Sequence, residues 1–302
     1  MGSAWMQIKT FSPNLDGGAR AVFHSGRLSS GNDKNNIDFV TISTAGNAID
    51  FGDSSQSTES CNTSCVSSRT RGLYAGGYKH PTGHHDQIGF ITISSTGNST
   101  DFGNLTQSRR GILGVSNETR GVFCGGLSPT PRDTVDYVTI ASTGNAQDFG
   151  DLAQARQSGT AMSSPTRGLL YGGYFHPSYA ANEFITIATL GSAQEFGDAL
   201  RYITQNLANR YNSAGVSNSI RGLAAGGVYP SPDTTTGNIE SYQLATLGNG
   251  NNFGDLIQTT RSKNGTASPV RAVFAGGTVG PSASTASATI DYVSMQTEGE
   301  AA

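Results

Sequence analysis

The chain has 302 residues, of which only 14% are charged while 40 are glycine. This composition is typical of many short β-strands joined by tight turns, and it argues against helices held by ion pairs. The formal net charge of −3 provides no electrostatic basis for binding nucleic acid or an anionic membrane surface. No stretch approaches 18 consecutive apolar residues, so we expect no helix inserted in a membrane.

The N-terminal residues 1–5 lack the charged and apolar regions of a secretory signal peptide. If the protein acts outside a cell, we therefore expect a route other than a signal peptide, and if it is a cellular protein we expect it in the cytoplasm. The three cysteines, Cys61, Cys65 and Cys124, are too few and odd in number for a disulfide scaffold. Cys61 and Cys65 would lie about 13 Å apart in one extended strand, which predicts free, partly buried thiols.

A signature of an arginine, a small residue, apolar residues and two glycines recurs along the chain. The copies begin at the following arginines, the first of them in a degenerate copy: Arg20, Arg71, Arg120, Arg167, Arg221 and Arg271. Each interval between them is close to 50 residues. A fixed period of this length is typical of propellers and solenoids.

Each Gly-Gly is followed by a variable polar stretch and then by a run of β-branched and aromatic residues. These runs lie at 37–42, 88–93, 135–140, 183–187, 239–244 and 290–295. A turn comes next, as at Gly97-Asn98 and Gly144-Asn145, whose residues tolerate the positive φ of a tight hairpin. The motif Asp-Phe-Gly-Asp, or a near-copy of it, follows at 50–53, 101–104, 148–151, 195–198 and 252–255.

Each period therefore contains four short strands, as does one blade of a β-propeller. We predict an all-β, six-bladed β-propeller of four-stranded antiparallel blades, formed as a single domain by residues 1–302. The small residues before each arginine, as in 158–163, predict that this strand lies nearest the crowded axis. The apolar strands on either side should pack the blades against one another.

The two ends of the chain complete one period between them. With Tyr292 aligned on Tyr137, Ala302 falls on Gln147; with Arg20 aligned on Arg167, Trp5 falls on Leu152 and Met1 on Asp148. This ungapped alignment predicts that residues 1–19 complete the sixth blade, with the termini meeting in its outer strand. Trp5 would occupy the space of the phenylalanine that this blade lacks.

The repeat resembles the kelch family of β-propellers. Kelch repeats carry Gly-Gly after an apolar strand, an aromatic residue in the next strand, and a further aromatic before a turn that leads to arginine. These positions correspond to Gly76-Gly77, Phe90, Phe102 and Arg110 in one repeat. In the next they correspond to Gly125-Gly126, Tyr137, Phe149 and Arg156. Phenylalanine stands where kelch repeats usually have tryptophan, so the chain would be a divergent variant.

The words Thr-Gly-Asn-x-x-Asp-Phe-Gly-Asp also resemble repeat proteins among the structural components of tailed phages, notably cyanophages. This resemblance implies a virion protein released by lysis, which agrees with the absence of a signal peptide. Its partners would be other virion proteins and possibly a host-surface glycan, with a homo-oligomer as a further possibility. No cofactor is implied.

The repeated arginines and acids are interpreted as structural, since a motif found in every blade usually serves the blade. We expect ion pairs and turn hydrogen bonds between the arginines and the acids beside the phenylalanines, such as Asp148 and Asp151. An anion-binding ring is the alternative. The structural repeat positions are Arg71, Arg120, Arg167, Arg221, Arg271, Asp101, Asp148, Phe102, Phe149 and Trp5.

Metal binding and catalysis have weak support. His84 and His85 are adjacent, so an extended chain would point them to opposite faces, and no other repeat supplies matching histidines. His24 lies in a predicted strand and is interpreted as a core histidine. The chain lacks a Gly-x-Ser-x-Gly elbow, and we expect no enzymatic activity.

The segments after Gly-Gly vary most, and variable loops commonly carry function. They run through 26–36, 78–87, 127–134, 174–182, 228–238 and 278–289, and should open on the same face as the blade-to-blade connections. The longest connection, 198–212, is expected on that face as a possible short helix. Candidate binding residues are Tyr78, His80, His84, Tyr174, Phe175, His176, Tyr179, Tyr202 and Tyr229.

Aromatic rings beside polar groups suit glycan stacking or protein contact. The sequence thus favours a non-enzymatic structural or recognition module of a phage particle, such as a fibre, tail or capsid-surface component. A cellular kelch-type adaptor that binds a protein partner is the alternative, and a kelch-fold carbohydrate-active enzyme is a third. Loops that vary without any binding role also remain open.

Overall fold

The computed structural model describes residues 7–8, 20–27, 33–55, 64–79, 81–174, 181–199, 210–230, 233–280 and 285–302. These residues form an all-β fold of small antiparallel sheets, with no helix in the described ranges. Accordingly, the described part contains no helix long and apolar enough to cross a membrane.

Six sheets follow the six copies of the repeat, and we number them in chain order. Sheet 1 contains β1 (Gln7–Ile8), β2 (Arg20–Arg27), β3 (Asp33–Thr41) and β4 (Ile49–Asp53). Sheet 2 contains β5 (Cys65–Ser67), β6 (Arg71–Ala75), β9 (Gln87–Thr92) and β10 (Thr100–Asn104). Sheet 3 contains β11 (Leu113–Ser116), β12 (Arg120–Cys124), β13 (Thr134–Thr139) and β14 (Gln147–Asp151).

Sheet 4 contains β15 (Thr160–Ser163), β16 (Arg167–Tyr171), β17 (Ala181–Thr186) and β18 (Gln194–Asp198). Sheet 5 contains β19 (Ala214–Ser217), β20 (Arg221–Ala225), β23 (Asn238–Gln243) and β24 (Asn251–Asp255). Sheet 6 contains β26 (Asn264–Ala267), β27 (Arg271–Ala275) and β30 (Ile290–Ser294). The four strands predicted for each repeat are thus present in five sheets, while the described residues supply three strands to the sixth.

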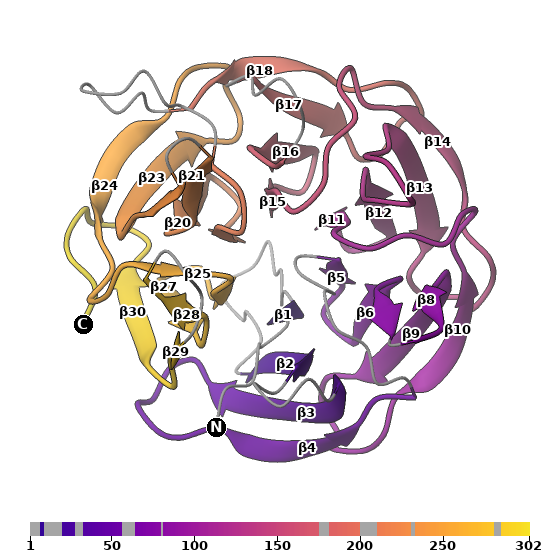
Figure 1. Cartoon of the computed structure of the whole chain (residues 1–302), viewed down its shortest axis with the longest axis horizontal. Coiled ribbons are helices and arrows are strands. Elements are labelled where there is room, and N and C mark those ends of the chain that lie inside the picture. Colours follow the sequence, from indigo (N-terminus) through magenta and orange to yellow (C-terminus); the bar gives the residue numbers. More distant parts are fainter. Residues whose placement is uncertain are drawn as a thin grey trace.

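The sheets lie side by side around a common centre (Figure 1). The strand before each repeat arginine lies nearest that centre, and the Asp-Phe-Gly-Asp strands β4, β10, β14, β18 and β24 lie on the outside. Neighbouring inner strands approach closely: a Cβ on Gly114 would lie 2.5 Å from the Cys65 carbonyl oxygen. This crowding explains the small residues predicted at the centre.

Apolar residues of adjacent sheets form shared clusters, as the sequence predicted. Leu73 and Phe102 of sheet 2 pack in one cluster with Phe123 and Ile140 of sheet 3. Phe102 and Phe149 are each only 2% exposed, so the outer strand contributes its aromatic ring to the space between two sheets. Burial of these rings stabilises the contact between neighbouring sheets by roughly 1.5–3 kcal/mol per side chain.

The turns that follow the third strands of sheets 2 to 6 each bind the outer strand of the preceding sheet. Gly191 N–H donates to the Phe149 carbonyl and Ala193 N–H to the Asp151 carbonyl, at 2.9 and 2.8 Å. The asparagines of these turns accept further hydrogen bonds, as Asn145 Oδ1 does from Asn104 N at 3.0 Å. Gly97 and Gly144 adopt the predicted positive φ, whereas Asn98 and Asn145 do not; each asparagine instead joins two sheets through its side chain.

We predict that Gly150→Ala lowers the free energy of unfolding by about 2 kcal/mol. Gly150 has φ of +141°, and an added Cβ would lie 2.7 Å from the carbonyl carbon of Gly191. Urea denaturation measures the change. Gly46→Ala, where a Cβ would meet nothing within 4 Å, is the matched control and should stay within about 0.5 kcal/mol of wild type. Equal effects of the two variants would contradict the close approach.

The predicted alignment of the N-terminus is wrong. Gln7 pairs with Phe23 as Ala161 pairs with Leu170, so β1 is the inner strand of sheet 1. Counted in that register, Met1 corresponds to Ala155 rather than to Asp148. The error arose because the segment between β1 and Arg20 is longer than its counterpart before Arg167. Residues 1–6, with Trp5, lie outside the described residues.

Candidate functional site

The variable loops and the connections between sheets lie together, as predicted. Leu127, after its Gly-Gly, exchanges backbone hydrogen bonds with Arg110 of the connection from sheet 2. Gly126 N–H donates to the carbonyl of Arg156, in the connection to sheet 4, at 2.8 Å. Each such loop is therefore held by the connections on both of its sides. We call this side of the molecule the loop face.

Several loops form additional small strands instead of irregular polar stretches. Their bounds are β7 (Tyr78–Lys79), β8 (Gly83–His84), β21 (Val228–Pro230), β22 (Asp233–Thr235), β25 (Thr260–Arg261), β28 (Thr278–Val279) and β29 (Thr285–Ala286). β7 pairs with β8 and β21 pairs with β22, while β28 lies between β25 and β29. These strands pair part of the backbone in the loops of sheets 2, 5 and 6.

Tyr78 and His84 form one aromatic and basic group on the loop face. Their rings meet edge to face with centroids 5.3 Å apart, and the Arg110 guanidinium lies 5.0 Å from the Tyr78 ring centroid. Burial, with help from Arg110 and His85, lowers the pKa of His84. A neutral imidazole beside a ring and a guanidinium offers stacking and hydrogen bonding to a polar ligand.

Tyr174 is the most exposed of the predicted binding residues that the structure describes. Its side chain is 48% exposed, and its ring meets Tyr211 edge to face at 5.5 Å. Tyr229, by contrast, is only 6% exposed and lies beside the Arg210 guanidinium, so its ring is not part of the surface. His80, Phe175, His176, Tyr179 and Tyr202, and the predicted short helix in the 198–212 connection, lie outside the described residues, as does Cys61.

Four buried ion pairs lie beneath this face, one in each of sheets 3 to 6. They join Arg109 to Asp136, Arg156 to Glu183, Arg210 to Glu240 and Lys263 to Asp291. Each cation comes from a connection and each acid from the third strand, and both side chains are almost completely buried. Each pair therefore attaches a connection to the interior of the sheet that follows it.

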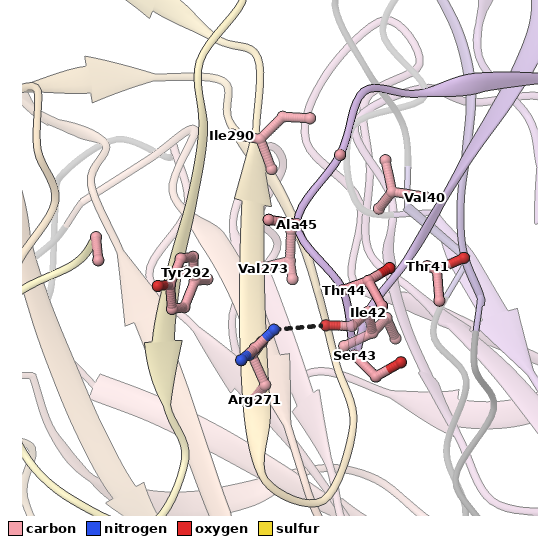
Figure 2. Close-up of a pocket in the computed structure, with 12 residues that line it drawn as sticks. Val40, Thr41, Ile42, Ser43, Thr44, Ala45, Arg271, Val273, Ile290 and Tyr292 are labelled. Atoms are coloured by element: carbon pink, nitrogen blue, oxygen red, sulfur yellow. Dashed lines mark hydrogen bonds between the residues drawn. The ribbon is translucent and has the colours of Figure 1, made fainter.

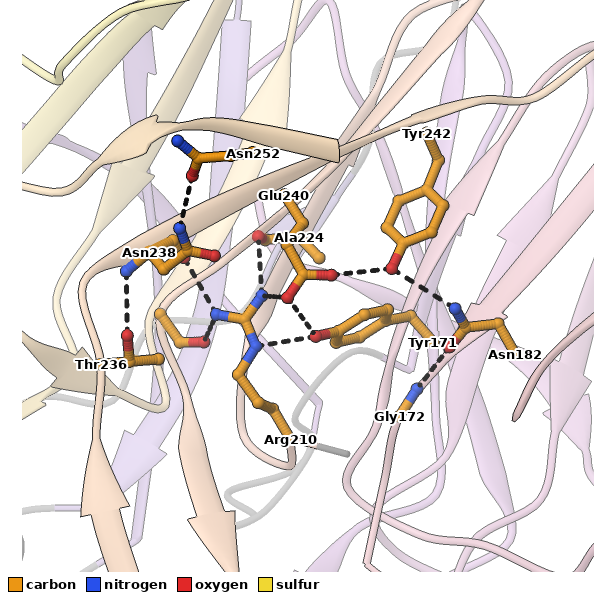
Figure 3. Close-up of polar contacts among 11 residues, drawn as sticks. Tyr171, Gly172, Asn182, Arg210, Ala224, Thr236, Asn238, Glu240, Tyr242 and Asn252 are labelled. Atoms are coloured by element: carbon orange, nitrogen blue, oxygen red, sulfur yellow. Dashed lines mark hydrogen bonds and ion pairs between the residues drawn. The ribbon is translucent and has the colours of Figure 1, made fainter. Parts of the chain in front are cut away.

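The Arg210–Glu240 pair is the centre of the most extended network (Figure 3). Arg210 Nη2 lies 2.7 Å from Glu240 Oε1, and Arg210 Nε donates to the Tyr171 hydroxyl at 2.7 Å. Tyr171 and Tyr242 donate to the two oxygens of Glu240 at 3.2 and 2.8 Å. Arg210 Nη1 donates to the carbonyls of Gly226 and Asn238, each at 2.9 Å.

The charges in this network hold one another in place. Burial alone would lower the pKa of Arg210, but Glu240, Tyr171 and Tyr229 raise that pKa above its ordinary value. Burial raises the pKa of Tyr171 and Tyr242, so both hydroxyls remain donors. The network lies away from solvent with its hydrogen-bonding groups occupied, and this arrangement joins sheets 4 and 5 without offering a reactive group.

The repeat arginines do not pair with the acids that the sequence suggested. No ion pair in the described ranges joins them to Asp148 or Asp151; instead each guanidinium donates to a carbonyl of the next sheet. The donor and acceptor pairs are Arg20 to Ile93, Arg71 to Ile140, Arg120 to Ile187, Arg167 to Ala245, Arg221 to Met295 and Arg271 to Ile42. The acids failed as partners because Asp101 and Asp148 lie exposed on the outer strands.

Each repeat arginine also lies over the aromatic ring of the third strand of its own sheet or over the outer phenylalanine. Arg71 lies 4.8 Å from the Phe90 ring centroid and Arg120 lies 4.6 Å from that of Tyr137. The predicted structural hydrogen bonds to turns are therefore present, with carbonyls as acceptors. A guanidinium held in this way joins two sheets through one hydrogen bond and one ring contact.

The burial of the cysteines and of His24 agrees in part with the predictions made from the sequence. Cys65 and Cys124 are both buried, more deeply than predicted, and Cys124 is a free thiol. His24 is 1% exposed, as expected for a core histidine. The described ranges contain no group of three or more His, Cys, Asp or Glu side chains that could hold a metal ion.

A pocket of about 320 Å³ lies between sheet 6 and sheet 1. Ile290, Tyr292 and Val273 line one side and the segment 40–46 lines the other, with Arg271 between them (Figure 2). The sequence reasoning missed this site because it assigned the N-terminus to this position.

Comparison of the chain with protein-family models and with curated proteins finds no match.

Proposed function

We propose that the chain is a six-bladed β-propeller formed as one domain. The supporting observation is the series of arginine contacts, which runs from each sheet to the next and returns from Arg271 of sheet 6 to Ile42 of sheet 1. The inner strand β1 also lies against both β5 and β26. Contacts of this kind between the last and first sheets are expected of a ring and not of an open solenoid.

On this scaffold we place a non-enzymatic recognition or structural function, in which the loop face presents aromatic groups to a ligand. The observation that carries the proposal is the exposed Tyr174 ring, supported edge to face by Tyr211. Tyr78, Arg110 and His84 provide a second aromatic group. Rings held by paired backbone lose little conformational entropy on binding, and they suit stacking on a sugar.

The setting we propose is a phage particle, with a host-surface glycan or a neighbouring virion protein as the ligand. The support for this setting is the resemblance of the Thr-Gly-Asn-x-x-Asp-Phe-Gly-Asp words to phage structural repeats. Cofactors, nucleic acid and membrane insertion have no part in the proposal. A homo-oligomer remains compatible with it.

A cellular adaptor that binds a protein partner is the second candidate, and one observation favours it. Leu190, Ile220, Leu247 and Val270 are 58%, 61%, 57% and 49% exposed. They lie in turns at the ends of the strands opposite the loop face, in neighbouring sheets 4 to 6. Apolar side chains gathered on one side are typical of a surface that contacts protein.

A glycan array probed with the purified protein tests the recognition function. We expect selective binding that Tyr174→Ala weakens at least tenfold, because the stacking ring is lost, while Leu247→Ala on the opposite side binds as wild type does. Thermal unfolding of both variants checks that the fold is retained. If the array is blank, or if both variants bind equally well, the loop face is not the glycan-binding surface.

A further inference from the structure

The two aromatic groups of the loop face occupy equivalent positions of the repeat. Tyr78 and Tyr174 each follow directly after a Gly-Gly, in the loops of sheets 2 and 4. Each ring is contacted by a side chain from the connection to the next sheet. The Arg110 guanidinium lies 5.0 Å from the Tyr78 ring centroid, and the Tyr211 ring centroid lies 5.5 Å from that of Tyr174. One position of the repeat therefore carries a cation beside sheet 2 and a second ring beside sheet 4.

Backbone pairing fixes the order of these positions on the loop face. Arg110 pairs with Leu127 in the loop of sheet 3, and Gln157 of the next connection pairs with Tyr174 in the loop of sheet 4. Leu127 and Gln157 are both half-buried, so each presents part of its side chain to solvent. We call the series of positions that runs from Tyr78 through Leu127 to Tyr174 the loop-face arc. It extends over three consecutive sheets.

Basic side chains gather over sheets 2 and 3. His84 pairs with Tyr78 across β7 and β8, and its ring meets the tyrosine ring edge to face, while Arg110 contacts the same ring. In the loop of sheet 3, Arg132 donates from Nε to the carbonyl of Ser128 at 2.9 Å, directly after Leu127 in sequence. One end of the arc therefore combines two guanidinium groups with an imidazole.

The charged groups that shift the pKa of His84 are both basic. Burial lowers this pKa, and Arg110 and His85 lower it further. The acid nearest in sequence, Asp86, is exposed. The imidazole is therefore neutral at pH 7, and it gains a proton only when the pH falls below its ordinary pKa of 6.5. A bound anion would oppose the repulsion from Arg110 and favour the protonated ring.

The other end of the arc is aromatic and uncharged. Tyr174 is 48% exposed, and Tyr211 supports its ring from the side. Between the two ends, the amide of Gln157 can donate and accept hydrogen bonds. An exposed ring beside a neutral amide suits the apolar face of a sugar and its hydroxyl groups. The two ends are thus suited to different parts of one extended ligand.

We propose that the loop-face arc binds an acidic glycan, with a carboxylate or sulfate group at Arg110 and His84 and a sugar ring stacked on Tyr174. The inference rests on the recognition function proposed above and adds the charge of the ligand. A guanidinium forms charge-assisted hydrogen bonds with either anion. Since the whole chain has a net charge of −3, the attraction would come from this local group of basic side chains.

Tetragalacturonate and its methyl ester test the proposal, because they differ only in the charge of their carboxyl groups. Isothermal titration calorimetry with the full chain should show at least tenfold tighter binding of the acid than of the ester. Arg110→Gln should remove this preference and leave the affinity for the ester unchanged, whereas Tyr174→Ala should weaken both ligands alike. Arg261→Gln is the matched control, because Arg261 holds the equivalent position before sheet 6, outside the arc, and it should bind both ligands as wild type does.

A sulfated chondroitin tetrasaccharide, measured in the same way, distinguishes the two anions. If it binds at least tenfold more tightly than its desulfated form and Arg110→Gln removes the difference, the ligand class is sulfated. The same pattern with tetragalacturonate alone assigns a carboxylate. Either result supports an acidic glycan.

The pH dependence provides a second readout, which also serves if Arg110→Gln does not fold. A carboxylate remains ionised above about pH 5, whereas His84 gains charge as the pH falls. Lowering the pH from about 7.5 to about 5 should therefore tighten the binding of tetragalacturonate at least threefold and leave that of the ester unchanged. His84→Gln should remove this increase. An affinity for the acid that does not rise with falling pH in wild type would contradict the role of His84.

The outcomes separate this inference from the recognition function itself. Glycans that bind through Tyr174 without any preference for acidic forms would overturn the inference and leave the recognition function standing. If no glycan binds, both are overturned. If poly-glutamate binds, Arg110→Gln abolishes its binding and no glycan binds, the arc recognises an acidic polypeptide instead, which would overturn the assignment to a glycan.

Discussion

Replacing Glu240 by leucine is expected to lower the free energy of unfolding by about 3–5 kcal/mol. The substitution leaves the Arg210 guanidinium completely buried without its acid, and it removes the acceptor of both the Tyr171 and the Tyr242 hydroxyls. Breaking a buried pair costs far more than the net contribution of the pair, because the remaining charge is poorly solvated. Urea denaturation gives the change in midpoint and slope.

The double variant Arg210→Met/Glu240→Leu separates charge from packing. It should recover much of the lost stability, since neither charge then remains buried. Glu195→Leu is the matched control on the exposed outer strand β18 and should change stability by no more than about 0.5 kcal/mol. A loss in Glu240→Leu as small as that of Glu195→Leu would contradict the role assigned to this ion pair.

The second large expected effect is a loss of stability at low pH that is caused by His24. His24 is completely buried, lies stacked on Tyr74 at 4.0 Å, and has no hydrogen-bond partner for either ring nitrogen among the described residues. Burial lowers its pKa from 6.5 to about 3. Between these two values the unfolded chain binds a proton that the folded chain does not, so the folded state loses stability as the pH falls.

His24→Phe, which keeps a ring against Tyr74, should remove this part of the pH dependence. Compared with wild type, the slope of unfolding free energy against pH between about 3 and 6.5 should be shallower by up to about 1.4 kcal/mol per pH unit. Chemical denaturation at a series of pH values measures both slopes. Ile49→Ala, at an exposed site, should keep the wild-type slope, and identical slopes for wild type and His24→Phe would show that His24 is protonated when folded.

Much of the local structure followed directly from residue patterns. The β-branched runs became third strands, the buried phenylalanines lay in outer strands, and His24 was internal. These features depend on alternation of side chains and on turn residues, which act over a few neighbouring positions. Repetition of each pattern at a period close to 50 residues made the assignment of strands secure.

The partners of the charged residues could not be found in the same way. Arg109 and Asp136 are 27 residues apart in sequence, and the loop that brings them together varies in length between copies. An internal signal existed: the acid of the third strand is replaced by Gly89 in sheet 2, and the position equivalent to Arg109, eleven residues before the repeat arginine, is Ser60 there. Cation and acid are thus lost together, as expected for residues that compensate for each other's burial.

By itself the sequence determined the repeating strands, their buried faces and their variable loops, because local periodicity specifies which side chains must leave water. The tertiary structure alone decided how the sheets join: arginine to carbonyl, turn to outer strand, and connection to buried acid. It also placed β1 as an inner strand, leaving the pocket beside β30. These arrangements depend on the register between segments that are distant in sequence. The additional residues between β1 and Arg20 were enough to make the predicted register of the N-terminal segment wrong.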